Sequence, residues 1–213
     1  MAAHDTRMLL LGAVALFEPV NGYQIRRELM SWQVDEWAHV NPGSIYNGLT
    51  TLTKQGHLVR HDLVDGGRPV AVYELTGSGR HELERLLEVS LTTVDLYDGV
   101  GFHAALGLLP LVDRPTAVRH LAQRLRALED LLPHLEGVTA PGRTDVPPHA
   151  LRSMELQLLR GRAERAWLVE LLDDVRSGQL SFRDEPMAWA PADDDPGWQM
   201  NADRERYRAL LGR

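Results

Sequence analysis

The stretch that decides the fold is residues 41–76, NPGSIYNGLTTLTKQGHLVRHDLVDGGRPVAVYELT. Its first part reads as a helix over 42–55, because Asn41 can cap the first turn and Pro42 needs no N–H partner there. Apolar side chains recur in it at helical spacing. Gly56 follows where a left-handed residue commonly ends a helix.

The second part of this stretch changes its period. Residues 57–64 and 69–75 alternate and are rich in β-branched side chains, and Asp65-Gly66-Gly67-Arg68 joins them. Two short alternating runs around a pair of glycines predict a β-hairpin. Its tip would carry two glycines and an arginine.

Further helices are predicted on both sides. Residues 5–17 are apolar on every side, which indicates a buried helix, and residues 22–32 form a short amphipathic one. Thr76 can cap a helix over about 78–98. Three helices, a hairpin and a helix are the order of a winged helix-turn-helix, which we expect over residues 1–80.

Composition excludes several classes. The 213-residue chain has no cysteine, so thiolate metal sites and cysteine nucleophiles are ruled out. The longest apolar run, residues 8–17, is too short to span a bilayer, so we expect a cytoplasmic protein without a membrane partner. His57 and His61 lie on a predicted strand and read as solvated side chains, so no metal site and no cofactor are expected.

Charge is unevenly distributed. The net charge is −7, yet residues 1–80 carry 7 basic and 8 acidic side chains. No acidic residue lies between Glu36 and Asp62, whereas two basic residues, Lys54 and Arg60, lie in this window. A surface built from this window suits a polyanion such as DNA. A chance absence of acids from a buried segment explains the charge pattern equally well.

The remaining chain is rich in leucine. Residues 118–135 and 149–177 repeat apolar side chains at spacings of three and four, which predicts an antiparallel helical dimerisation domain over 81–178 and leaves a tail over 179–213. The dimerisation residues are expected to be Leu151, Met154, Leu158, Gly161, Leu168 and Leu172. Leu156, Leu159 and Trp167 would need another partner, most simply a second copy of the chain. Closure of both seams within a monomer is the alternative.

Separate motifs in one order resemble the PadR family of bacterial transcriptional regulators. They are Leu11-Gly12, Gly22-Tyr23-Gln24-Ile25, Pro42-Gly43-Ser44-Ile45-Tyr46 with Leu49 and Leu52, Gly56 and Leu58, Gly67-Arg68-Pro69, Tyr73-Glu74-Leu75-Thr76 and Gly79-Arg80. Length and helical pattern resemble the larger subgroup, which has a multi-helix C-terminal dimerisation domain. The fold class expected is mainly α with a small β-hairpin.

The resemblance implies a homodimer that binds double-stranded DNA at a dyad-symmetric operator and represses until a small effector binds. The residues expected to contact DNA are Tyr23, Gln24, Pro42, Gly43, Ser44, Tyr46, Asn47, Thr51, Lys54, Gly66, Gly67 and Arg68. The small polar side chains of helix 42–55 would face the major groove, and the tyrosines and Arg68 the phosphate backbone. The family commonly has proline where Asn47 stands, and this amide suits an adenine edge.

Resemblance also implies a pocket for a small aromatic or hydrophobic effector. Tyr97, Phe102, His103 and Trp167 are the candidates, because flat rings stack on aromatic ligands. A plain helical core explains the same residues. No catalytic motif occurs, so an enzyme is not expected. The alternative from another class is a helical adaptor or scaffold protein that uses the winged-helix domain for protein contacts.

Overall fold

The computed structural model describes residues 2–142, 145–186, 190–195 and 197–212. The chain divides into two compact units, the first made of residues 1–87 with 189–213 and the second of residues 88–188. The sequence predicts a boundary near residue 80 and a separate tail from residue 179. In the structure the first unit extends to residue 87, and the last part of the chain packs with it.

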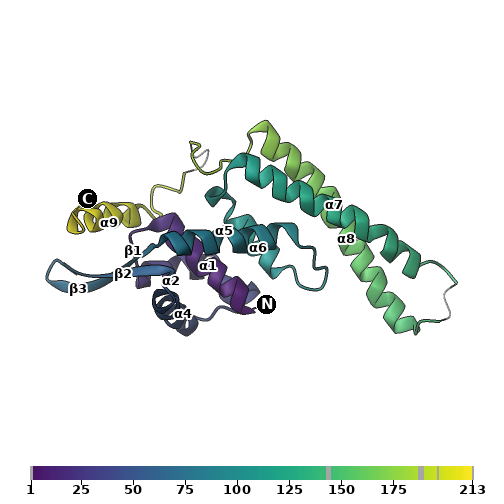
Figure 1. Ribbon diagram of the computed structural model, residues 1–213, viewed down its shortest axis with the longest axis horizontal. Helices are drawn as coiled ribbons and strands as arrows, with labels where there is room; N and C mark the ends of the chain where they lie inside the picture. The colour runs from purple at the N-terminus through teal and green to yellow at the C-terminus, as the bar shows by residue number, and fades with distance from the viewer. Residues whose placement is uncertain (1, 143–144, 187–189, 196, 213) are drawn as a thin grey trace. The chain divides into compact units, whose positions relative to one another are not determined.

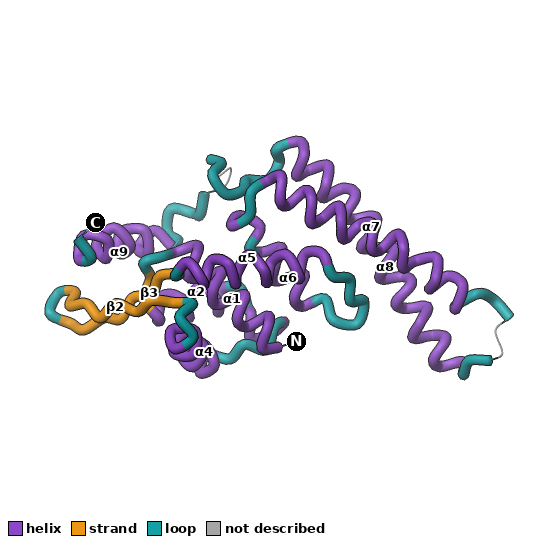
Figure 2. The backbone as a smooth tube through the Cα atoms, viewed as in Figure 1, coloured by secondary structure: helices purple, strands orange, loops and turns teal. Residues whose placement is uncertain are grey.

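The first unit carries the helices and strands predicted from the deciding stretch (Figures 1 and 2). In chain order it contains α1 (Ala2–Phe17), β1 (Val20–Asn21), α2 (Gly22–Ser31), α3 (Val34–Trp37), α4 (Pro42–Lys54), β2 (Leu58–Asp65), β3 (Arg68–Leu75), most of α5 (Gly77–Thr92) and α9 (Gly197–Leu210). The strands form one antiparallel sheet in the order β1-β3-β2. The unit is therefore a winged helix-turn-helix with an added C-terminal helix.

The core of this unit forms around α1. Every residue of 8–14 is buried, and α1 contacts α2, α4 and β3. The prediction of a buried helix over 5–17 is thus confirmed, although the helix begins three residues earlier. Ile25 and Leu29 of α2 are fully buried as well. A central helix whose residues 8–14 are apolar and buried on every side lets the surrounding helices keep a polar face outward.

Helix α4 and the hairpin follow the sequence prediction closely. Ile45, Leu49 and Leu52 are buried, which fixes the opposite face of α4 outward. Asn41 is the N-cap residue, but its side chain makes no capping hydrogen bond, contrary to the expectation. Asp65 pairs with Arg68 across a two-residue turn in which the two glycines have φ of 56° and 81°. Side chains at two successive positive φ angles would be strained, so the glycines define this turn.

The second unit is helical in its described residues. It contains the end of α5, then α6 (Val100–Gly107), the 3-10 helix η1 (Leu109–Leu111), α7 (Arg114–Val138) and α8 (Pro148–Ser177). The helix predicted over 78–98 ends at Thr92, because the Asp95 carboxylate accepts hydrogen bonds from the N–H groups of Tyr97 and Asp98 and forms a turn. Proline inside a helix commonly disturbs it, yet α7 continues past Pro133.

Helices α7 and α8 form an antiparallel pair. Ion pairs of Arg165 with Glu129 at 3.0 Å and of Arg162 with Glu136 at 2.7 Å fix their register. The positions expected to bind a second copy pack within the chain instead. Of these, the fully or nearly buried ones are Leu158, Gly161, Leu168 and Leu172, whereas Leu151 and Met154 are half-buried. The α8 seam is therefore covered by α7, because an amphipathic pair satisfies its own apolar faces first.

The C-terminal part of the chain, which the sequence analysis leaves as a tail, contains α9 (Gly197–Leu210). Met200, Asp203 and Tyr207 are buried, and α9 contacts α1 and β1. Figure 1 shows it beside the short strand β1. Over the described residues, no helix has the length and apolar character needed to cross a membrane.

Candidate nucleic-acid interface

The outward face of α4 consists of short polar groups with one positive end. Pro42, Gly43, Asn47, Thr51 and Lys54 are exposed. Ser44 is half-buried at the start of the same face, and Tyr46 is 43% exposed. No carboxylate lies on this helix. Such a face can enter the major groove and offer hydrogen bonds to base edges without repelling phosphates.

The hydroxyl groups of this face also bond to the helix itself. Ser44 donates to the carbonyl oxygen of Asn41 at 2.7 Å, and Thr51 donates to that of Asn47 at 2.8 Å. These bonds hold both side chains in defined rotamers, and each hydroxyl oxygen keeps lone pairs that can accept from a base. The face is therefore pre-arranged before any ligand arrives.

The hairpin tip provides the second part of the surface. Gly66, Gly67 and Arg68 are all exposed at the turn between β2 and β3. On β2, Arg60 is already paired with Asp62 at 2.7 Å, and this hydrogen bond raises the pKa of Arg60. Arg68 is thus the basic group of the hairpin that stands at its tip. An arginine on a narrow turn can reach the phosphates or the groove beside the one that α4 enters.

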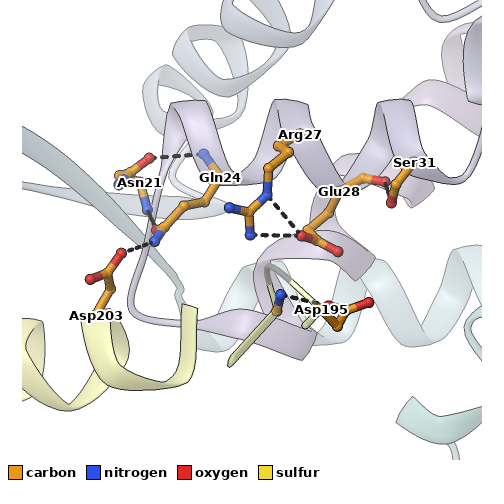
Figure 3. Close-up of polar contacts among 8 residues, drawn as sticks. Asn21, Gln24, Arg27, Glu28, Ser31, Asp195 and Asp203 are labelled. Carbon is orange, nitrogen blue, oxygen red and sulfur yellow. Dashed lines mark hydrogen bonds and ion pairs between the residues drawn. The ribbon is translucent and has the colours of Figure 1, made fainter. Parts of the chain in front are cut away.

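Of the two residues at the start of α2 that the sequence predicts to contact DNA, one is exposed and the other is buried. Tyr23 is 63% exposed, whereas Gln24 is only 4% exposed. Gln24 and Asn21 form a reciprocal capping box, with bonds of 2.9 Å and 3.1 Å (Figure 3). Gln24 Nε2 also donates to Asp203 of α9 at 2.7 Å. Gln24 therefore holds α2 and α9 together in this structure, away from the surface where the sequence predicts it.

The sequence analysis did not single out two arginines on α2, Arg26 and Arg27. A shallow hollow of about 220 Å³ on this helix is lined by Tyr23, Arg26, Arg27 and Met30. Arg27 pairs with Glu28 at 3.0 Å, while Arg26 Nε is buried with no hydrogen-bond partner. The signal in the sequence is the arginine pair three and four residues after Tyr23, a spacing that puts these side chains on one helix face.

The effector candidates lie in the second unit and come together only in part. The rings of Phe102 and Trp167 meet edge to face with centroids 6.1 Å apart. The guanidinium of Arg124 lies over the Phe102 ring, 3.6 Å from its centroid. Tyr97 is 75% exposed and His103 is exposed as well. The helical-core explanation thus accounts for Phe102, and the effector role of these four residues stays a prediction.

A helix with an acid-free polar face, a glycine-tipped hairpin and a buried supporting helix define a winged-helix DNA-binding protein. Within the described residues, no cluster of three or more histidine, aspartate or glutamate side chains has the geometry to hold a metal ion.

Comparison with known family models finds a match for the N-terminal part of the chain. Residues 10–85 match the family model described as "Transcriptional regulator PadR-like family". The chain therefore carries over these residues a domain similar to that of the PadR-like transcriptional regulators.

Several solved structures are similar to this chain. Bacillus subtilis PadR in complex with operator DNA is 22% identical, with 79% of this chain and 98% of that chain covered and a TM-score of 0.33. Bacillus subtilis PadR in complex with p-coumaric acid is 20% identical, with 81% and 99% covered and a TM-score of 0.31. A PadR-like transcriptional regulator from Bacillus cereus is 18% identical, with 79% and 94% covered and a TM-score of 0.32. No curated protein matches the chain in sequence.

Proposed function

We propose that this regulator is a cytoplasmic homodimeric repressor whose two winged helices bind a dyad-symmetric operator, and that a small aromatic or hydrophobic effector releases it. The observation that carries the proposal is the exposed, acid-free face of α4 in the same unit as the exposed Arg68 tip. Two copies of such a unit, related by a two-fold axis, match a palindromic site in successive major grooves.

The roles within one unit follow from position. Asn47 and Thr51 stand in the middle of the exposed face of α4 and would read base edges, with Lys54 at its end on a phosphate. Tyr23 and Tyr46 would donate their hydroxyls to the phosphate backbone. Tyr46 lies against the backbone of Gly22, where an added Cβ would come within 3.2 Å of the ring, so α2 orients this tyrosine.

The dimer is supported by the face of α8 that α7 does not cover. Leu156, Leu159 and Trp167 are 46%, 61% and 42% exposed. Large apolar side chains gathered on one helix face commonly mark an interface. The contact surface that we propose is therefore this outer face of α8, for which the sequence also predicts a second copy, and not the seam of Leu158, Leu168 and Leu172, which is buried within the chain.

The proposed dimer is tested by a substitution that introduces a charge on the outer face of α8. Leu159→Glu is expected to shift the purified protein from dimer to monomer in light scattering coupled to size exclusion, because a carboxylate would be buried in the interface. Leu210→Glu is the matched control, since Leu210 is similarly exposed on α9. A Leu159→Glu protein that stays dimeric would exclude this face.

The operator is tested by titration against the DNA upstream of the protein's own gene, at several salt concentrations and with unrelated DNA as competitor. Saturable binding that survives competitor, with one dimer per site, is the expected result. Weak binding that salt removes equally on both DNAs would favour the adaptor alternative.

Two variants separate the parts of the surface. Arg68→Ala should weaken binding at all sequences and reduce the salt slope by about one unit, because one phosphate contact is lost. Asn47→Ala should instead change the preference at one base pair per half-site. If the Arg68→Ala protein bound every site as tightly as the wild type does, the β2–β3 hairpin (the wing) would not be part of the interface.

The effector is tested by Trp167 fluorescence during titration with small aromatic compounds, followed by the DNA titration in their presence. A quench that is absent in Trp167→Phe and that accompanies release of DNA is expected. Loss of DNA binding without any change at Trp167 would place the effector site elsewhere.

A further inference from the structure

Helix α9 lies outside the segment that matches the family, yet it is built into the DNA-binding unit. Its Tyr207 hydroxyl accepts from Asn21 at 2.8 Å, and Asp203 accepts from the buried Gln24. Arg204 donates to the carbonyl oxygens of Leu16 and Phe17, which lie in the last turn of α1, where carbonyls have no partner within the helix. These contacts dock α9 against the first turn of α2 and the last turn of α1.

One further contact reaches the wing. Arg206 donates from Nε to Asp65 Oδ2 at 3.0 Å, and its Nη2 lies 2.9 Å from the same oxygen. Asp65 is the last residue of β2 and the strand partner of Arg68 across the turn. The carboxylate of Asp65 thus stands beside the one arginine that the proposed interface uses at this tip.

The charge at the tip depends on this contact. Asp65 and Arg68 alone would give the turn no net charge, and a carboxylate there would repel the phosphates that Arg68 is to meet. Arg206 supplies a positive charge beside Asp65, and it shares that charge with Asp203 on its own helix, whose Oδ1 accepts from Arg206 Nη2 at 2.7 Å. The hydrogen bond that it donates to Asp65, with the charges of Asp203 and Asp65, raises the pKa of Arg206, so the guanidinium stays fully charged.

We propose that Arg206 of α9 is a positioning residue for DNA binding, which cancels the charge of Asp65 and holds the wing tip so that Arg68 faces the phosphates. The inference rests on the proposed DNA-binding surface. Arg206 is 45% and Asp65 26% exposed, and half-exposed ion pairs add little to stability, so the effect belongs to binding and not to folding.

The test compares four proteins at the operator: the wild type, Arg206→Ala, Asp65→Asn and the double variant. Arg206→Ala should weaken binding about three- to tenfold near 0.1 M salt, because it uncovers the Asp65 carboxylate close to DNA. Asp65→Asn should bind as tightly as the wild type or more tightly. The double variant should recover to within about twofold of the wild type, because the carboxylate at the tip is gone. Asp203, which also pairs with Arg206 at 2.7 Å, would still accept from Gln24 and Gln199.

The matched control is Arg208→Ala, an exposed arginine on the same helix that pairs with Glu205 at 2.7 Å. Its affinity should equal that of the wild type. If Asp65→Asn and Arg206→Ala weaken binding equally and the double variant shows no recovery, the contact acts only as a brace and the charge proposal is wrong. A wild type without specific DNA binding would instead overturn the proposed function itself.

Discussion

Arg124 is the residue whose replacement tests the packing of the second unit most directly. Its side chain is 1% exposed in the middle of α7, between the buried Leu121 and Leu128. Its Nε donates to Glu164 of α8 at 2.6 Å, and its Nη1 donates to the carbonyl oxygens of Ser90 and Thr93 at the end of α5. One guanidinium thus connects three helices of the unit.

The loss of stability expected for Arg124→Met follows from the buried acceptors that would lose their hydrogen-bond donor. Methionine keeps the apolar stem, so the loss comes from the Glu164 carboxylate and two carbonyl groups without their donor. Removing one partner of a buried ion pair costs about 3–5 kcal/mol. Glu164 keeps 21% exposure and some hydration, so we expect about 2–3 kcal/mol. For a chain of this length, that lowers the Tm by about 5–10 °C.

The assay is urea unfolding followed by circular dichroism and tryptophan fluorescence, with a thermal scan beside it. Arg124→Met/Glu164→Gln should recover about 1 kcal/mol or more relative to Arg124→Met, because the stranded charge is removed. Arg126→Met, at an exposed position two residues along, should stay within about 0.5 kcal/mol of the wild type. An Arg124→Met protein as stable as the Arg126→Met control would refute the reasoning.

Two more predictions concern the first unit. Gly79→Ala should cost about 2 kcal/mol or more in urea unfolding, because the added Cβ would lie 2.0 Å from the carbonyl oxygen of His57; Gly77→Ala, where a Cβ meets nothing within 4 Å, should be neutral. Glu82 has its pKa lowered from 4.5 to about 2, chiefly by the hydrogen bond from Arg85, so its stabilisation is complete above about pH 5 and is lost as the pH falls toward 2. Glu82→Gln should therefore be about 1 kcal/mol less stable than the wild type at pH 7, and the difference should shrink to a few tenths of a kcal/mol (~0.3) near pH 2.5. A constant difference across that range would contradict this cause.

Local chemistry explains why the deciding stretch could be interpreted from its residues alone. The helix predicted over 42–55 is α4 (Pro42–Lys54), and the paired glycines form the turn expected of them. Both predictions depend on interactions within a few residues of chain. The same reasoning missed α3 (Val34–Trp37) and β1 (Val20–Asn21), since one turn and two residues show no period, and β1 exists only because β3 pairs with it.

The sequence could not choose partners for polar residues far apart in the chain. Gln24 belongs to a motif that suggests DNA contact, but its amide donates to Asp203, 179 residues away. Arg124 lies beside the apolar seam predicted for its helix, and the sequence alone does not show that it is buried and donates to Glu164. Such choices are made by three-dimensional neighbours, which no local spacing encodes.

What the sequence by itself determined is the DNA-binding element. The acid-free polar face of α4, the glycine turn and the buried α1 follow from residue type and period, because helix and hairpin rules act over short range. What only the tertiary structure decided is which apolar positions are used up inside the chain and which distant charges meet. Helix α8 buries Leu168, where the sequence predicts a contact with a second copy, and α9 brings Arg206 to Asp65. Both outcomes depend on packing between distant segments, where burial and charge pairing are settled together.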